Sequence, residues 1–294
     1  MKKQQHVTAV RQQQQELPRD LRQGQKEQQE QKEQQEQKED TMGAQTGISW
    51  TQKTWNGAIG CSRVSPGCSN CYAERMAATK FRHFTGGPVW GRSNPRYITS
   101  DQLWRAPLKW AREARETGTR VMVFGNSLYD FCENAPQINA IRPRLWELVD
   151  ETRDVITWQF ITKRPERLGE CLPRSWGRFW TGVWLGTSIE TAAYAARADH
   201  LRAVRAEVRF LSVEPALGPV ADAVNLSGID WCIWGGESGP GYRPADQQWA
   251  RDLLAACQRS GVAFFYKQGA GARSGMNPTL DGVAYHQFPT PRSP

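Results

Sequence analysis

Short apolar runs recur along most of this chain, and each is followed by polar residues and then by a stretch of helix-forming residues. The clearest runs are Arg120–Phe124, Val155–Ile161, Val183–Gly186, Val208–Leu211, Ile229–Trp234 and Val262–Tyr266. Their nearly continuous apolar character is typical of strands that are buried on both faces. Strands that alternate with helices indicate a parallel sheet, and this many repeats predict an α/β fold built as a full or partial β/α barrel.

The stretches around these runs predict helices. They cover Tyr72–Phe81, Leu103–Glu116, Ile138–Asp150, Glu166–Cys171, Thr191–Val204 and Asp246–Ser260. Pro107 is expected to interrupt the second helix, because proline has no amide hydrogen to donate. Asp246 is expected to cap the last helix. A further strand-like run ends at Gly60 and is expected to be the first strand of the series.

Polar residues follow the predicted strands at equivalent positions. They are Asn126, Lys163, Ser188, Glu190, Glu214, Glu237 and Lys267. In a parallel barrel the carboxyl ends of the strands converge at one mouth, where active sites are built. The recurrence of polar residues at these positions therefore predicts a functional site at the mouth.

Composition divides the chain into three parts. Residues 1–42 are dominated by Gln, Glu and Lys, so they are expected to be a disordered tail or a fraying, solvated helix. The abrupt change at Met42 suggests that the first 41 residues are an upstream extension of the reading frame. Residues 43–275 are expected to form the barrel domain, and residues 276–294 an irregular C-terminal tail.

The formal net charge is +8, and residues 1–42 contribute none of it because their basic and acidic residues balance. A basic folded part is compatible with a nucleotide or nucleic-acid partner, or serves solubility alone. No apolar run is long enough to span a membrane, and no apolar segment follows Lys2 and Lys3 as in a secretory signal. Seven cysteines, four of them scattered singly, predict a reducing, cytoplasmic location.

Three cysteines lie close together in the stretch Gly60–Tyr72, which is called the cysteine loop below. Cys61, Cys68 and Cys71 have the spacing C-x6-C-x2-C, and the turn-forming residues between them would let three thiolates meet at one centre. A four-iron cluster normally takes four cysteines, so three would leave one iron open. The alternatives are a structural zinc site completed by His83 or a distant cysteine, and three unconnected cysteines.

Cysteines after the first strand of a β/α barrel, with a Cys-x-x-Cys step and an adjacent aromatic residue, resemble the radical S-adenosylmethionine (radical SAM) enzymes, whose barrels are TIM-like. More specifically, several stretches look like a phage-associated three-Cys-motif family. They are Ile48–Thr51 with Thr54–Asn56, Gly60–Glu74, Thr162–Glu166, Ser212–Pro215, Gly235–Pro240 and Lys267–Gln268. Together they span nearly all of the predicted folded part.

The resemblance implies a [4Fe–4S] cluster that is held by Cys61, Cys68 and Cys71 and whose open iron chelates S-adenosylmethionine. Reductive cleavage would then generate a 5′-deoxyadenosyl radical that modifies an unknown substrate, for which the basic charge suggests a nucleotide or nucleic acid. By position, S-adenosylmethionine would be held by Asn126, Ser127, Ser188 and Glu190. The substrate side would be lined by the candidate catalytic residues Glu214, Glu237 and Lys267.

Two other functions stay open. One is a zinc-stabilised nucleic-acid-binding protein without catalysis, and the other is a barrel hydrolase or lyase that uses Glu214 and Glu237. Individual carboxylates also have a structural alternative, because Glu190 and Glu214 would pair with Arg164, Arg209 or Lys267 in a buried ion network. The dipeptide Lys163–Arg164 would hold a carboxylate or a phosphate, or would simply begin a solvated helix.

Overall fold

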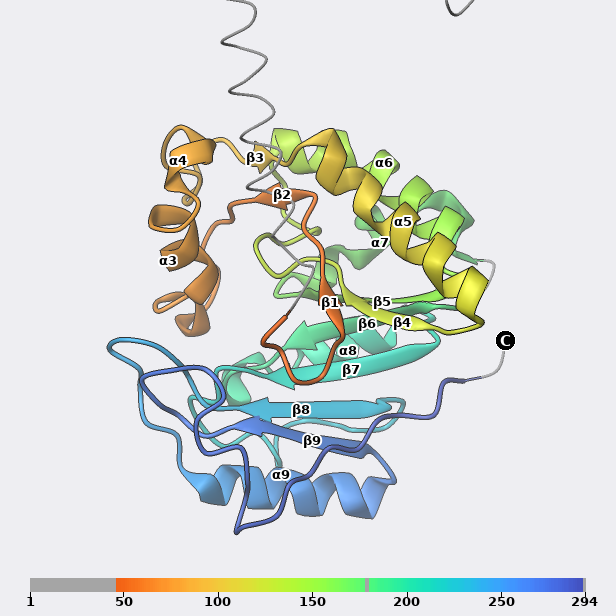
Figure 1. The fold of residues 1–294 in the computed structure, drawn as a ribbon. Coiled ribbons are helices and arrows are strands. Elements are labelled where there is room, and N and C mark those ends of the chain that lie inside the picture. The colour runs from red at the N-terminus through yellow and green to blue at the C-terminus, as the bar shows by residue number, and fades with distance from the viewer. Residues whose placement is uncertain (1–45, 178–179, 293–294) are drawn as a thin grey trace, which may run out of the picture. The chain divides into compact units, whose positions relative to one another are not determined.

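The computed structural model describes residues 46–177 and 180–292, which belong to one unit of the chain, Met42–Pro294. Within these residues the centre is a seven-stranded, all-parallel sheet that curls into a half-barrel (Figure 1). In spatial order its strands are β1 (Lys53–Thr54), β4 (Val121–Phe124), β5 (Ile156–Thr162), β6 (Val183–Ser188), β7 (Val208–Val213), β8 (Trp231–Gly235) and β9 (Ala263–Gln268). The predicted α/β fold with a partial parallel barrel is confirmed.

The register of the sheet brings the strand ends to one level. Thr162 pairs with Thr187, Ser188 with Ser212, and Val213 with Trp234. In Figure 1 the arrowheads of β8 and β9 point to the side on which α3 lies. The residues that follow successive strands therefore meet at one edge of the half-barrel, which is called the mouth below.

Helices alternate with the strands along the chain. They are α3 (Tyr72–Ala78), α4 (Arg82–Thr85), α5 (Asp101–Thr117), α6 (Pro136–Thr152), α7 (Leu168–Cys171), α8 (Arg197–Arg202) and α9 (Gln247–Ser260). Short 3₁₀ turns add η1 (Pro66–Cys68), η2 (Pro165–Arg167), η3 (Arg174–Gly177) and η4 (Ala192–Tyr194). Asp246 caps α9 as predicted, since its carboxylate accepts from the amide of Gln248 at 2.8 Å. The predicted helix 72–81 ends early, at Ala78, and the predicted helix 191–204 is divided into η4 and α8.

Helix α5 runs through Pro107 without a break, so the predicted interruption is wrong. Proline at this position cannot donate to the carbonyl of Leu103, one turn earlier. The indole Nε1 of Trp55 donates to that carbonyl instead, at 2.8 Å. A buried side chain from the start of the domain thus supplies the hydrogen bond that the helix lacks.

The strand that was expected directly before the cysteine loop is not part of the half-barrel. Strand β2 (Ala58–Ile59) pairs antiparallel with β3 (Tyr97–Ile98) in a separate two-stranded sheet. The first strand of the parallel sheet is β1, which has only two residues. The amide of Gly60 donates to the carbonyl of Leu128 at 3.0 Å, and this hydrogen bond fixes the chain after β2 to the segment that follows β4 at the mouth.

Aromatic side chains fill the concave face of the half-barrel. Trp50 is 2% exposed and packs against Phe124, Phe210 and Trp231. This filling closes the interior away from the mouth.

The predicted tail, residues 1–42, lies outside the described residues. At the other end, the amide of Tyr266 donates to the carbonyl of Tyr285, so part of the predicted C-terminal tail runs along β9; the domain limits stay a prediction. None of the described helices combines the length and the apolar character that crossing a membrane requires.

Candidate functional site at the mouth

The cysteine loop lies at the mouth, between β2 and α3 (Figure 1). Its middle forms η1, and Cys71 is the residue that precedes α3. A Cβ atom on Gly67 would lie 2.5 Å from Oε1 of Glu190, so no larger residue fits there without displacing that carboxylate. The loop therefore approaches the end of β6 as closely as a backbone can.

The three cysteines of the loop are free thiols, as are the other four, all of which the structure describes. Cys68 is buried, and Cys61 and Cys71 are partly exposed. Burial raises the pKa of Cys61 and of Cys71, and the nearby cations Arg164 and Lys163 respectively oppose that rise. Arg164 Nη1 lies 3.6 Å from Sγ of Cys61. Because the thiolate is the form that binds metals, both cations favour the ligand state.

Glu133, in the segment after β4, holds the beginning of the loop. Its Oε1 accepts from the hydroxyl of Ser62 at 2.5 Å, and its Oε2 accepts from Nε of Arg96 at 2.7 Å. Arg164 also donates to the carbonyl of Ser62 at 2.8 Å and pairs with Asp130 at 2.8 Å. Burial alone would raise the pKa of Glu133, but these donors hold it below its ordinary value.

Glu190, at the end of β6, holds the middle of the loop. Its Oε1 accepts from the hydroxyl of Ser65 at 2.7 Å and from the ammonium of Lys163. Its Oε2 accepts from Arg197 at 2.9 Å. The carboxylate is fully buried, and the two cations lower its pKa despite that burial.

Glu237, after β8, holds the end of the loop. Its Oε2 accepts from the amide of Asn70 at 2.9 Å and from Nε of Arg243 at 2.9 Å. Arg243 in turn donates to the carbonyl of Pro66 at 3.1 Å. Three carboxylates from segments that follow three different strands thus bind three polar residues of the cysteine loop.

Glu214 and Lys267 form an ion pair at the ends of β7 and β9, with 2.6 Å between Nζ and Oε1. Glu214 therefore forms the ion pair that was expected as its structural alternative, and its partner is Lys267, not Arg164 or Arg209. The carboxylate lies over Gly235, where a Cβ atom would be 2.6 Å from Oε1. Its second oxygen accepts from Ser212 at 3.2 Å. Both side chains of the pair keep some exposure, 15% and 18%, which leaves a carboxylate and an ammonium accessible at the mouth.

The other predicted residues are also brought to the mouth, where their polar groups bond to the chain. The amide of Asn126 bonds to both the amide and the carbonyl of Ile161, and so continues the ladder between β4 and β5. Ser127 accepts at its hydroxyl from Asn56 and at its carbonyl from Tyr72. The carbonyl of Ser188 accepts from Arg197 at 2.8 Å. Their roles toward S-adenosylmethionine stay predictions.

Sequence reasoning missed five charged residues of the site, namely Asp130, Glu133, Arg96, Arg197 and Arg243. The first two could have been found, because both follow β4 within ten positions and so belong at the mouth. Arg197 and Arg243 carry no such signal. They reach back to Glu190 and Glu237 from seven and six positions further along the chain.

The chemistry of the cysteine loop fits a cluster. It presents three free thiols on one loop, with Arg164 beside one and Lys163 acting on another. Within residues 46–177 and 180–292, no group of three or more His, Cys, Asp or Glu side chains is arranged to hold a single metal ion. Cys61, Cys68 and Cys71 therefore remain the predicted ligands by donor chemistry, not by an observed coordination geometry.

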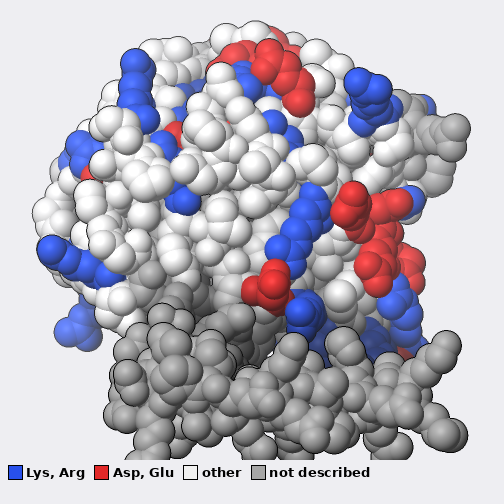
Figure 2. Space-filling model, turned by 90° about the horizontal axis from the view of Figure 1, so that it is seen from above, with Lys and Arg blue, Asp and Glu red and all other residues white. Residues whose placement is uncertain are grey.

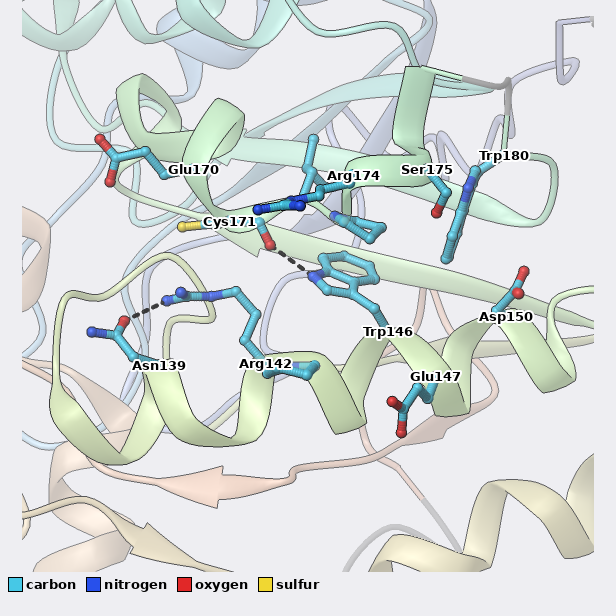
Figure 3. Close-up of a pocket in the computed structure, with 13 residues that line it drawn as sticks. Asn139, Arg142, Trp146, Glu147, Asp150, Glu170, Cys171, Arg174, Ser175 and Trp180 are labelled. Carbon is cyan, nitrogen blue, oxygen red and sulfur yellow. Dashed lines mark hydrogen bonds between the residues drawn. The ribbon is translucent and has the colours of Figure 1, made fainter.

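A pocket of about 440 Å³ lies away from this site, between α6 and the segment that contains α7 and η3 (Figure 3). Trp146 and Trp180 form part of its wall, and Glu147 and Asp150 lie along its α6 side. The indole of Trp146 already donates to the carbonyl of Cys171 at 2.7 Å. The pocket contains none of the residues predicted for the site.

Comparison with known proteins gives one result. A family model described as "Protein of unknown function (DUF5131)" matches residues 45–289. No curated protein and no solved structure gives a significant match. The match covers the half-barrel, the cysteine loop and every residue of the candidate site.

Proposed function

The chain belongs to the DUF5131 family, and on the geometry of its mouth we propose that it is a radical SAM-like iron–sulfur enzyme. One observation carries the proposal. A loop with three free cysteines is tied to the carboxyl ends of a parallel half-barrel by Glu133, Glu190 and Glu237. The mouth of a parallel barrel is where active sites are usually found. A metal-binding loop that is fixed there is therefore better placed for catalysis than for stabilising the fold.

In this proposal Cys61, Cys68 and Cys71 hold a [4Fe–4S] cluster. Once bound, the cluster would supply the electron that cleaves S-adenosylmethionine to a 5′-deoxyadenosyl radical. Arg164 and Lys163 stabilise the thiolate ligands and offset their negative charge.

The other polar residues have different tasks. Ser127, whose carbonyl accepts from Tyr72 of the loop, and Ser188, two positions before Glu190, would bind S-adenosylmethionine. Glu214 and Lys267 offer a proton acceptor and a proton donor on the substrate side. Among the described residues, none of those in the cysteine loop forms a hydrogen bond with either side chain.

The hydrolase or lyase alternative has less support. It requires Glu237 to exchange a proton with a substrate together with Glu214. Glu237 instead accepts from Asn70 and from Arg243, and these hydrogen bonds keep its pKa low although burial acts against them. A carboxylate in this state is a poor general acid.

Anaerobic reconstitution with iron and sulfide tests the proposal. We expect a brown, oxygen-sensitive protein with about four irons per chain, as one [4Fe–4S] cluster requires. Cys68→Ala should lose the cluster, whereas the matched control Cys257→Ala, a buried cysteine of α9, should retain it. With dithionite, the loaded protein should convert S-adenosylmethionine to 5′-deoxyadenosine. Stoichiometric zinc in the aerobic protein, with no cluster formed under any condition, would sink the proposal.

A further inference from the structure

The segment 75–100, called the basic segment below, is free of acidic residues. It contains Arg75, Lys80, Arg82, Arg92 and Arg96 but no Asp or Glu. Lys80, Arg82 and Arg92 are exposed, and no ion pair joins them to an acidic residue of the described part of the chain. Figure 2 shows Lys and Arg with few acidic neighbours on the left of the face, the side of α3 and α4. The positive charge of these three side chains is therefore not neutralised by acidic residues of the described part of the chain.

The basic segment is fixed to the cysteine loop at several points. Helix α3 begins directly after Cys71, and the amide of Gly91 donates to the carbonyl of Cys61 at 2.9 Å. Arg96 pairs with Glu133, the same carboxylate that accepts from Ser62. A small core of its own stiffens it, formed by Ile59, Ala73, Ala77, Phe81, Val89 and Leu128. The exposed cations thus lie on a packed segment that is anchored to the cysteine loop.

Exposed aromatic rings border the same loop. Tyr72 is 41% exposed and follows Cys71 directly. Tyr242 is 42% exposed and stands between two residues that bind the loop, because the carbonyl of Gly241 accepts from Asn70 and Arg243 donates to Pro66. Aromatic side chains beside a basic surface are the combination on which single-stranded nucleic acids bind, with phosphates on the cations and bases on the rings.

We propose that the substrate is a single-stranded nucleic acid that lies along the basic segment and presents a base to the cysteine loop between Tyr72 and Tyr242. This inference rests on the proposed function for the chemistry but not for the binding. A free nucleotide would engage only one or two of the cations. A duplex would keep its bases stacked and out of reach of the loop. An anionic membrane would be attracted to the cations, but it has no bases that could stack on the two tyrosine rings.

Fluorescence anisotropy with a labelled 20-nucleotide single strand tests binding on the full chain. The test variant is the triple substitution Lys80→Gln, Arg82→Gln, Arg92→Gln. The control removes the same charge from exposed positions of α5: Arg105→Gln, Lys109→Gln, Arg112→Gln. We expect the test variant to bind about 10- to 100-fold more weakly than the control. The slope of log K against log salt should fall by about 2, since each phosphate contact on a single strand contributes about 0.7.

Further arms separate the possible ligands. Tyr242→Ala should weaken the binding of the intact strand by about tenfold but leave the binding of an abasic strand unchanged, because only bases stack on the ring. Equal losses in the test and control triples, or tighter binding to phosphatidylserine vesicles than to the strand, overturn the inference. The assay works with and without the cluster. Reductive cleavage of S-adenosylmethionine without strand binding therefore refutes this inference alone. Strand binding by a protein that forms no cluster under any reconstitution condition refutes the proposed enzyme alone.

Discussion

The hydroxyl of Ser65 donates a 2.7 Å hydrogen bond to Glu190, and this bond joins the cysteine loop to the end of β6 across 125 positions of the chain. Glu190 is fully buried, and Lys163 and Arg197 supply its counter-charges. A carboxylate in this setting has no oxygen turned to solvent. The geometry therefore makes Glu190 a support of the cysteine loop, whatever else it contacts when a cofactor is bound.

Replacing Glu190 with Gln should loosen the loop. The substitution keeps the size of the side chain but leaves the buried Arg197 and the partly exposed Lys163 without their negative partner, which costs about 3 kcal/mol in the free energy of unfolding. We expect the reconstituted variant to hold less than half of the wild-type iron and to lose it faster to a chelator. Iron content, chelation rate and urea unfolding measure these effects. Wild-type iron retention at normal stability would show that the bond from Ser65 is dispensable.

Gly67→Ala tests the same contact from the side of the loop. Its Cβ atom would lie 2.5 Å from Oε1 of Glu190, so either the carboxylate or the loop has to move. We expect a loss of iron similar to that of Glu190→Gln. The double variant should be little worse than either single one, because both changes break one contact. Gly169→Ala is the control, since a Cβ atom there meets nothing within 4 Å. Additive losses in the double variant would contradict a shared cause.

Acid should release the loop before it unfolds the half-barrel. Neighbouring cations and hydrogen-bond donors lower the pKa of Glu133, Glu190 and Glu237 in the folded chain, although burial alone would raise it. A carboxyl group whose folded pKa is depressed stabilises the fold above its unfolded pKa, about 4.3, and loses that contribution as the pH falls through the folded value. The protection of the amides of residues 61–71 against hydrogen exchange, corrected for the intrinsic rate at each pH, should therefore fall between pH 6 and pH 3. Unchanged protection at pH 3 would refute this.

Trp55 and Pro107 offer a double-mutant cycle on the core. Trp55→Phe should cost about 1–3 kcal/mol in unfolding free energy, because the carbonyl of Leu103 is left buried without a donor. In a Pro107→Ala background the helix regains its own amide donor, so the same substitution should cost less. Urea unfolding of the four proteins measures the coupling. An equal cost of Trp55→Phe in both backgrounds would mean that the indole hydrogen bond does not replace the missing helix bond.

These cases show which features the sequence could predict. Apolar runs such as Val208–Leu211 and Val262–Tyr266 predicted strands because burial on both faces leaves few other residue types possible. Parallel pairing then placed the residues after each strand at one edge, which is why Glu190, Glu214 and Lys267 could be assigned to the mouth. Local composition was therefore sufficient to predict these strands, and the rule for parallel pairing was sufficient to place these three residues at the mouth.

The rest depends on contacts between distant segments. Two residues suffice for β1 because its pairing with β4 decides its structure, and no periodicity can show in so short a run. Pro107 reads as a helix breaker until Trp55 is known to satisfy Leu103. Likewise, a carboxylate after a strand looks the same in the sequence whether it faces a ligand or the hydroxyl of Ser65. The side-chain partners, the two-residue strand β1 and the continuity of α5 through Pro107 were therefore beyond prediction.

The pair Glu214 and Lys267 should affect turnover without affecting the cluster. No residue of the cysteine loop bonds to either side chain in the described part of the chain, so Glu214→Gln should load iron as the wild type does. If the pair exchanges protons during the reaction, formation of 5′-deoxyadenosine should fall by at least about tenfold in this variant and in Lys267→Met. Glu190→Gln gives the opposite pattern, with lost iron and turnover in proportion to the iron that remains. Loss of iron in Glu214→Gln would assign the pair to structure, and unchanged turnover would exclude it from the reaction.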